Sequence, residues 1–143
     1  MKTDSLLPMP VKDIIPHGPP ICMIDRLLEF GNGSGILESI ILSESIFIDE
    51  SGVLEPSAMV ELVAQSYAAV KGYEDRLNGK PVKQGFLVGI SEFDFLGRAF
   101  TGDKLQIFVK TAGIFENFAM VEGKISCGEK VIASGSIKFW LIE

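Results

Sequence analysis

The second half of the chain carries four long runs that are rich in Ile, Val and Phe and are separated by turn residues. Runs of β-branched and aromatic residues bounded by Gly, Asp and Asn are typical of strands. We therefore expect four strands, at Gln84–Phe95, Lys104–Phe115, Phe118–Cys127 and residues 131–142. Because these strands follow one another along the chain, we expect them to form an antiparallel meander.

The pattern changes over residues 56–70, where the sequence reads PSAMVELVAQSYAAV. Ala, Met and Leu favour a helix, Pro56 suits the first helical position, and Gly72 is a plausible stop. Glu61 is the only carboxylate in this stretch. A helix that is apolar nearly all round is typically buried, so we expect this helix in the interior.

The first third of the chain is less regular. Residues 11–15 are compatible with one short helical turn, residues 22–30 with a segment that begins helical and then extends, and residues 35–42 with a strand. The absence of alternating helices argues against a parallel sheet. The order of elements favours an α+β fold in which a curved antiparallel sheet wraps around one long buried helix, and the length predicts a single domain over residues 1–143.

Charge and composition exclude several classes of function. The net charge is −6 with no cluster of Lys or Arg, which excludes a nucleic-acid-binding face. No charge-free run is long enough to span a membrane, and the first residues do not resemble a signal peptide. Cys22 and Cys127 form no metal or redox motif, so we expect reduced thiols in the cytoplasm and neither a metal nor another cofactor.

Glu61 is the leading candidate for chemistry. A carboxylate in apolar surroundings is costly to bury unless it is partnered, and such surroundings favour its neutral form, as a general acid requires. Gln65 lies four residues later on the same helix face and could bind either Glu61 or a ligand. The alternative is a glutamate near a helix start that faces solvent.

His17 is the only histidine, and it lies in the proline-rich stretch PHGPP. A lone histidine in such a turn is commonly structural. However, the flanking prolines would hold the imidazole in place, and histidine is the side chain whose ordinary pKa suits a base near neutral pH. If the protein uses a histidine, it must be this one.

Three stretches, taken in order, resemble the 3-hydroxyacyl-[acyl-carrier-protein] dehydratases of bacterial fatty-acid synthesis. They are IPHGPPICMIDRLLEF (residues 15–30), SAMVELVAQSYAA (57–69) and GFLVGISEFDFLGRAFTGDKLQI (85–107). The match is colinear and implies the hotdog fold of that family. It also implies that Glu61 is the catalytic acid and Gln65 its companion, which we assign to substrate binding.

One motif departs from that family. Its catalytic histidine belongs to a His-Phe-Pro-Gly segment, and at the corresponding distance before Glu61 this chain has Phe47. No histidine occurs over residues 47–56, which end in Gly-x-Leu-x-Pro. This segment is similar to a divergent branch that includes predicted dehydratases of aryl polyene synthesis. In that branch His17 is the candidate for the missing base.

The resemblance implies dehydration of a 3-hydroxyacyl thioester to a trans-2-enoyl thioester, with the thioester carried by an acyl carrier protein or CoA. It implies a backbone N–H of Gly89 that polarises the thioester carbonyl, and a homodimer whose interface forms the site. The mean hydropathy of +0.31 also suggests apolar surface covered by a partner. Two alternatives remain: a thioester hydrolase in which Glu61 activates water, and a non-catalytic acyl-binding subunit.

Overall fold

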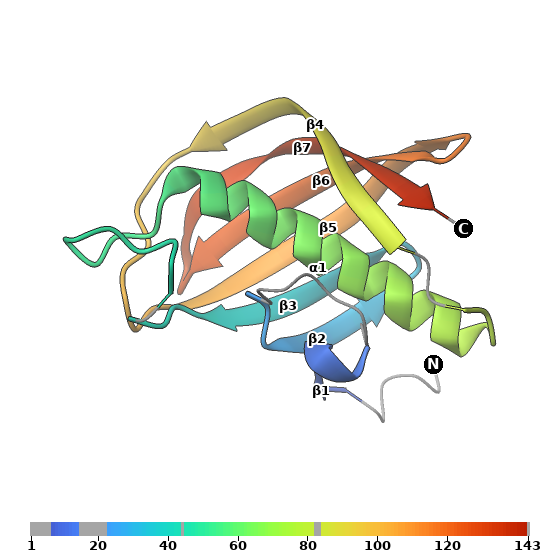
Figure 1. The fold of residues 1–143 in the computed structure, drawn as a ribbon, viewed down its shortest axis with the longest axis horizontal. Helices are drawn as coiled ribbons and strands as arrows, with labels where there is room; N and C mark the ends of the chain where they lie inside the picture. Colours follow the sequence, from blue (N-terminus) through green and yellow to red (C-terminus); the bar gives the residue numbers. More distant parts are fainter. Residues whose placement is uncertain (1–6, 15–22, 44, 82–83, 143) are drawn as a thin grey trace.

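The computed structural model describes residues 7–14, 23–43, 45–81 and 84–142. Seven strands and one long helix account for most of these residues (Figure 1). In chain order the elements are β1 (Met9–Pro10), the 3₁₀ turn η2 (Val11–Asp13), β2 (Arg26–Gly31), β3 (Ser34–Ile40), α1 (Pro56–Leu77), β4 (Gln84–Phe95), β5 (Lys104–Phe115), β6 (Phe118–Cys127) and β7 (Lys130–Ile142).

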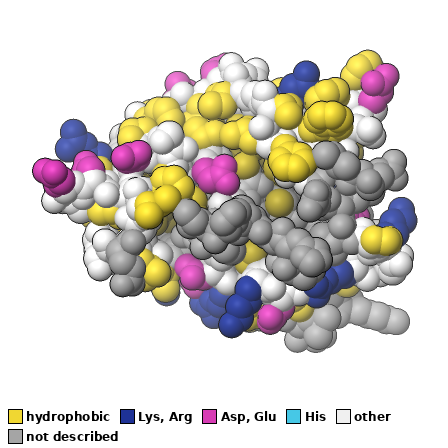
Figure 2. Space-filling view, viewed as in Figure 1, with side chains coloured by type: hydrophobic (Ala, Val, Ile, Leu, Met, Phe, Trp, Pro, Cys, Tyr) yellow, Lys and Arg dark blue, Asp and Glu magenta, His cyan; other side chains and the backbone are white. Residues whose placement is uncertain are grey.

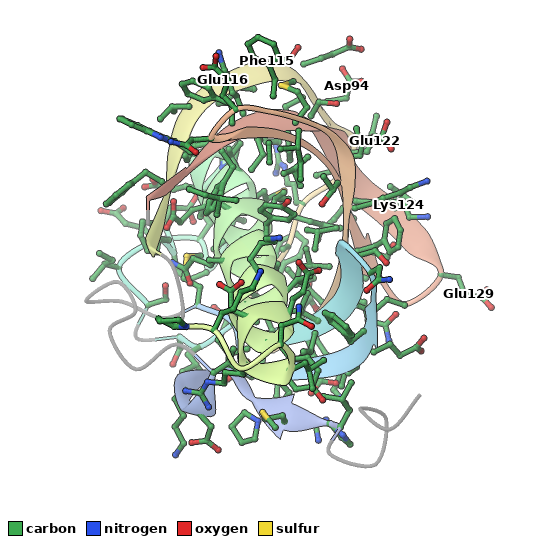
Figure 3. All side chains as sticks on the ribbon, turned by 90° about the vertical axis from the view of Figure 1, so that its right-hand side faces the viewer. Asp94, Phe115, Glu116, Glu122, Lys124 and Glu129 are labelled. Atoms are coloured by element: carbon green, nitrogen blue, oxygen red, sulfur yellow. The ribbon has the colours of Figure 1, made fainter. Side chains whose placement is uncertain are left out.

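All seven strands belong to one antiparallel sheet in the order β1-β2-β3-β5-β6-β7-β4. The sheet curves around α1, which lies along its concave face (Figures 1 and 3). This arrangement is the hotdog fold, so the fold class expected from the sequence is confirmed. The bounds of the four C-terminal strands also agree with the pattern to within one residue.

The predicted four-stranded meander is wrong for β4. Strands β5, β6 and β7 do form a meander, but β4 pairs with β7 and forms an edge of the sheet, while β5 pairs with β3. The eight residues between β4 and β5 are too many for a tight hairpin. Instead, they run alongside the segment that precedes the helix. The Leu54 N–H donates to the carbonyl oxygen of Ala99 at 2.8 Å.

Two further expectations are corrected at segment ends. The helix does not stop at Gly72, which is buried inside it, but continues to Leu77 and ends at Asn78 and Gly79, where Gly79 has a φ of +68°. A glycine inside a helix costs only about 1 kcal/mol, which tertiary packing offsets. Residues 23–25 are not helical, because backbone bonds tie Asp25 to β3 and to η2: its N–H donates to Glu38 O, and its carbonyl accepts from Val11 N–H.

Glycines on the concave face let the helix approach the sheet closely. A Cβ at Gly123 of β6 would lie 2.5 Å from Val63, and one at Gly35 of β3 would lie 2.6 Å from Val70. Tyr67 of the same helix face packs edge-on against Phe139 at a ring-centroid distance of 5.2 Å. These contacts fix which face of α1 meets the sheet.

The buried phenol of Tyr67 is partnered. Its hydroxyl forms a 2.8 Å hydrogen bond with Thr111 Oγ1, which itself donates to Gly33 O. Burial raises the pKa of Tyr67, so the phenol stays neutral at physiological pH. The convex face of the sheet carries charged side chains, and Figure 3 shows Asp94, Glu122 and Lys124 pointing away from the helix.

Candidate active site

Glu61 lies in the second turn of α1, on the side of the helix that faces away from the sheet. With 100° per residue, a face that presents Val63 and Val70 to the sheet leaves Glu61 and Gln65 roughly opposite. Glu61 is half-buried. Its Oε2 accepts a 3.0 Å hydrogen bond from Gln65 Nε2. The carboxylate is therefore partnered and half-buried, which favours the first of the two expectations over a freely solvated helix-start glutamate.

Gln65 connects this carboxylate to the N-terminal part of the chain. Its side chain is buried, and its Oε1 accepts a 2.7 Å hydrogen bond from the backbone N–H of Met23. The carbonyl of Met23 accepts a 2.5 Å bond from Ser39 Oγ on β3. Three segments that are distant in the sequence therefore meet behind Glu61.

His17 lies outside the described residues. The segment that contains it, residues 15–22, begins after Ile14 and ends before Met23. Ile14 is fully buried, and Met23 is held by Gln65, four residues along the helix from Glu61. The described structure therefore connects Met23, the residue after the histidine segment, to the candidate acid through the Gln65 side chain.

Gly89 lies in the middle of β4, paired with Lys138, next to a bulge in the register with β7. A Cβ at this position would meet only Lys138 Cβ, at 3.9 Å. The fold itself therefore does not require glycine here. The added Cβ would lie beside exposed Lys138, on the face of the sheet away from α1.

We expect Gly89→Ala to fold normally and to lower kcat/KM by roughly tenfold to a hundredfold, since a small displacement of a reacting group can cost that much. Melting temperature and turnover of 3-hydroxyacyl thioesters are the measurements. Gly113→Ala is the control, because a Cβ at that strand position meets no heavy atom within 4 Å. Full activity of Gly89→Ala would remove this residue from the site.

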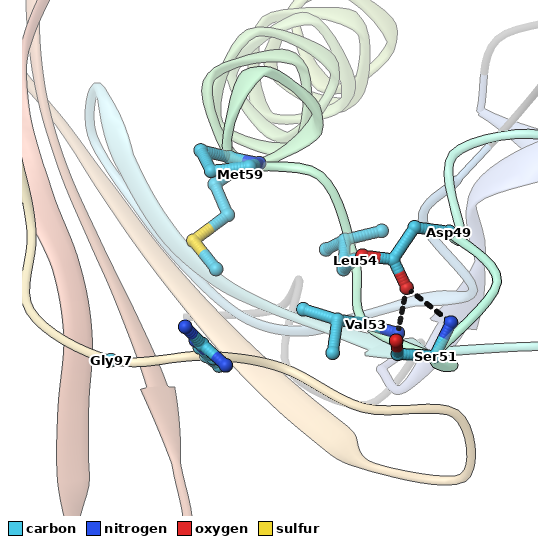
Figure 4. A pocket seen from close by; sticks show the side chains of 8 residues that line it. Asp49, Ser51, Val53, Leu54, Met59 and Gly97 are labelled. Carbon is cyan, nitrogen blue, oxygen red and sulfur yellow. Dashed lines mark hydrogen bonds between the residues drawn. The ribbon is translucent and has the colours of Figure 1, made fainter.

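The loop before the helix contains the position at which the fatty-acid dehydratases would have their histidine. Phe47 is half-buried against the core, and its carbonyl accepts a 2.9 Å bond from Glu55 N–H. Asp49 folds this loop by accepting hydrogen bonds from Ser51 and Val53 N–H, at 2.8 and 3.0 Å (Figure 4). The loop therefore supplies a packed aromatic ring where that family has an imidazole.

A pocket of about 290 Å³ opens between this loop and the start of α1 (Figure 4). Leu54, Pro56 and Met59 give it an apolar floor, and Arg98 lines it from the connection after β4. Arg98 is exposed and has no ion pair or hydrogen bond with any other described residue. Glu61 is not part of its lining.

Within the described ranges, no group of three or more His, Cys, Asp or Glu side chains is arranged to hold a metal ion. No helix in the described part of the chain is long and apolar enough to cross a membrane.

The model of the ApeP-like family, described as ApeP dehydratase, matches residues 9–141. The chain belongs to the ApeP-like dehydratase family. The family resemblance and the dehydratase class expected from the sequence are thus confirmed. The match spans nearly the whole chain, including the segment that contains His17 as well as the helix that carries Glu61.

Individual proteins agree with this assignment. The 3-hydroxyacyl-[acyl-carrier-protein] dehydratase FabZ of Natranaerobius thermophilus is 28% identical over 142 residues, covering 93% of this chain and 95% of that protein. The structure titled "The Dehydratase Heterocomplex ApeI:P from Xenorhabdus doucetiae" aligns with a TM-score of 0.84 and 21% identity, covering 94% of this chain and 92% of that one.

A hypothetical thioesterase of Streptococcus pneumoniae, solved with coenzyme A, aligns with a TM-score of 0.65 at 10% identity, covering 81% of this chain and 84% of that one. A likeness at this level shows the shared fold alone. It does not favour the hydrolase alternative over dehydration.

Sequence reasoning brought Glu61 and Gln65 together correctly but missed Met23 and Ser39. Nothing in the sequence pattern marks either residue. Met23 contributes only its backbone, and Ser39 occupies an ordinary strand position. Their contribution depends on contacts between segments 16 to 42 residues apart.

Proposed function

We propose that this protein dehydrates a 3-hydroxyacyl thioester to a trans-2-enoyl thioester, with Glu61 as the acid and His17 as the base. The observation that carries the proposal is the hydrogen-bonded connection from the Glu61 carboxylate through Gln65 to Met23, the residue that follows the His17 segment. In a chain of a dehydratase family, this connection ties Met23, the residue that follows the His17 segment, to the only carboxylate of residues 56–70.

The proposed reaction needs two proton transfers. His17 takes the proton from C2 of the substrate, and Glu61 gives a proton to the C3 hydroxyl, which leaves as water. The C2–H and C3–O bonds break, and a C2=C3 double bond forms. Proton exchange with solvent then returns His17 and Glu61 to their starting states. No redox change occurs.

The thioester carbonyl must be polarised for C2 to lose a proton. We assign this to the backbone N–H of Gly89, aided by the positive end of the α1 dipole. The irregular pairing beside Gly89 supports the assignment, because the register between β4 and β7 shifts between Leu87 and Gly89 and interrupts the regular ladder of backbone hydrogen bonds.

We further propose that the thioester is presented by an acyl carrier protein. FabZ relatives bear the acyl-carrier-protein dehydratase name. Arg98 supports this choice, because it is an exposed cation without an ion-pair partner among the described residues, at a pocket with an apolar floor that Asp49 and Ser51 also line. It suits the phosphate of a phosphopantetheine arm or an acidic carrier surface. CoA thioesters share the same phosphopantetheine chemistry.

We propose a homodimer formed through β4, with residues 1–143 acting as one domain in each subunit. This strand is a free edge of the sheet. Along it, Phe86, Val88 and Ile90 are 45–55% exposed, and Figure 2 shows apolar side chains gathered on this face. An unpaired apolar edge favours pairing with another strand, and a twofold dimer is the simplest solution. The free thiol of Cys127 is consistent with a cytoplasmic protein.

We expect the wild-type protein to have twice the 15.6 kDa chain mass in sedimentation at micromolar concentration. Ile90→Lys should shift the mass toward the monomer and weaken association at least about a hundredfold, because a twofold interface would bury the unpaired charge twice. Ile114→Lys, on an equally exposed residue of the β5–β6 hairpin, is the control and should leave the mass unchanged. A monomeric, active wild-type protein would contradict the dimer.

The test of the reaction is direct. The protein is incubated with 3-hydroxyacyl thioesters on a carrier protein and, separately, on CoA, and enoyl absorbance and free thiol are followed together. Enoyl product without thiol release supports dehydration. Thiol release from acyl thioesters that lack the hydroxyl would indicate a hydrolase, and binding without either product would indicate a non-catalytic subunit.

A further inference from the structure

We infer that Gln65 and Ser39 form a clamp on Met23 that positions the His17 segment relative to Glu61, which makes Gln65 a positioning residue and not a substrate ligand. The inference rests on the proposed function, because it explains why the chain holds Met23 close to the catalytic acid Glu61. The clamp consists of three hydrogen bonds: Gln65 Nε2 to Glu61 Oε2, Met23 N–H to Gln65 Oε1, and Ser39 Oγ to Met23 O.

The orientation of the Gln65 amide is determined by the backbone at Met23. A backbone N–H can only donate, so it must face the Gln65 oxygen, which leaves the Gln65 NH₂ toward Glu61 Oε2. Turning the amide by 180° would set the Gln65 NH₂ against Met23 N–H. The bond to Met23 would then be lost, so Met23 holds the amide in a single orientation.

Both side chains that bind the Met23 backbone are buried. Gln65 is 7% exposed and Ser39 is 1% exposed. Hydrogen bonds in such surroundings are strong, and leaving one of their polar groups unpaired is costly. Each anchor belongs to a regular element, Gln65 to α1 and Ser39 to β3. Met23 is therefore held between the central helix and the sheet.

The consequence concerns the geometry of catalysis. Acid and base must approach the substrate from positions that are set to within a fraction of an ångström. Glu61 is held by the helix itself, whereas His17 belongs to a segment six residues before Met23. The same amide binds both Met23 and Glu61, so the residue at which the His17 segment ends is tied to the acid.

Three substitutions separate the parts of the clamp. Ser39→Ala removes the bond to the Met23 carbonyl and leaves the Gln65–Glu61 pair intact. Gln65→Glu keeps an oxygen for Met23 N–H but, when ionised, offers Glu61 no donor. Gln65→Leu removes both bonds. Ser39→Thr retains the hydroxyl and should restore function, and Ser134→Ala, on a serine of β7 outside the clamp, is the matched control.

Kinetics provide the first readout. We expect Ser39→Ala to lower kcat about tenfold and Gln65→Leu about a hundredfold, each with KM changed less than about threefold, because positioning acts on the reacting geometry. The double variant should lose less than the product of the two single losses, since both act on one unit. Gln65→Glu should move the pH profile of kcat, because two carboxylates one helical turn apart interact.

Nuclear magnetic resonance provides the second readout and does not depend on turnover. His17 is the only histidine, so its ring-proton signals are unique in the spectrum. We expect these signals to shift in Ser39→Ala and Gln65→Leu and to stay unchanged in Ser134→Ala. The Met23 amide should exchange with solvent at least about tenfold faster in Gln65→Leu and at nearly the wild-type rate in Gln65→Glu.

The outcomes distinguish the clamp from the reaction. Shifted His17 signals with the expected kcat losses support the clamp. Unmoved His17 signals and Met23 exchange in both Ser39→Ala and Gln65→Leu overturn it, whatever the activity. Faster solvent exchange of the Met23 amide together with an unchanged kcat also overturns the positioning role. If the wild-type protein makes no enoyl product, the proposed dehydration fails, and the resonance measurements still decide whether the clamp exists.

Discussion

Glu61→Gln should lower kcat for dehydration by about 10²–10⁴-fold, the usual cost of removing an acid–base group. Glutamine keeps the size of the side chain and a carbonyl oxygen that can accept from Gln65 Nε2, but it cannot give a proton to the leaving hydroxyl. Because Glu61 is half-buried and not part of the packed core, the melting temperature should change by only a few degrees. Enoyl formation under saturating substrate measures the effect.

The matched control is Glu55→Gln. Glu55 precedes the same helix and is exposed, and its side chain makes no capping hydrogen bond. Its neutralisation should leave kcat within about twofold. His17→Ala should lower kcat by a similar 10²–10⁴-fold, and the double variant should be little worse than either single variant, as for groups that act as a unit. Undiminished turnover in both single variants would refute the assignment of the catalytic pair.

Gly135→Ala should destabilise the protein by at least about 3 kcal/mol, at the upper end of overpacking effects. A Cβ at Gly135 on β7 would overlap the carbonyl oxygen of Glu92 and lie 2.5 Å from Phe93 Cα, both in the backbone of β4. A backbone cannot rotate away as a flexible side chain can, so β4 must shift along its whole length. Thermal unfolding should show a decrease of roughly 10 °C.

Gly113→Ala is the control for this prediction also, because it adds the same methyl group at a strand position with no heavy atom within 4 Å. Its free energy of unfolding should change by less than about 1 kcal/mol. Because β4 carries Gly89 and forms the proposed dimer edge, Gly135→Ala should also lose activity at temperatures where it is still folded. A wild-type melting temperature for Gly135→Ala would show that β4 is held less closely than the structure indicates.

Local pattern was sufficient for the individual elements. The strands at Gln84–Phe95, Lys104–Phe115 and Phe118–Cys127 agree with their expected bounds, because runs of β-branched residues and the turn residues between them act over a few positions. Pro56 marks the true start of the helix. The pairing of Glu61 with Gln65 follows from helical spacing alone.

The arrangement of those elements required the tertiary structure. No local signal states that β4 leaves the meander to pair with β7, or that Gly72 continues a helix that Asn78 and Gly79 terminate. These choices depend on which apolar faces can be buried together. The close approach of α1 to the sheet at Gly35 and Gly123 also depends on how these faces pack together.

The candidate active site shows the same contrast between what local sequence predicts and what tertiary packing decides. The sequence by itself singled out the carboxylate at Glu61 and predicted a partner for it, because an apolar helix cannot hold an unpaired one cheaply. It also placed the sole histidine at His17. Only the tertiary structure decided that Gln65 binds the backbone of Met23 and that Ser39 holds the other side of that residue. A backbone group has the same chemistry at every position, so its partner is set by packing between distant segments and not by the residue type.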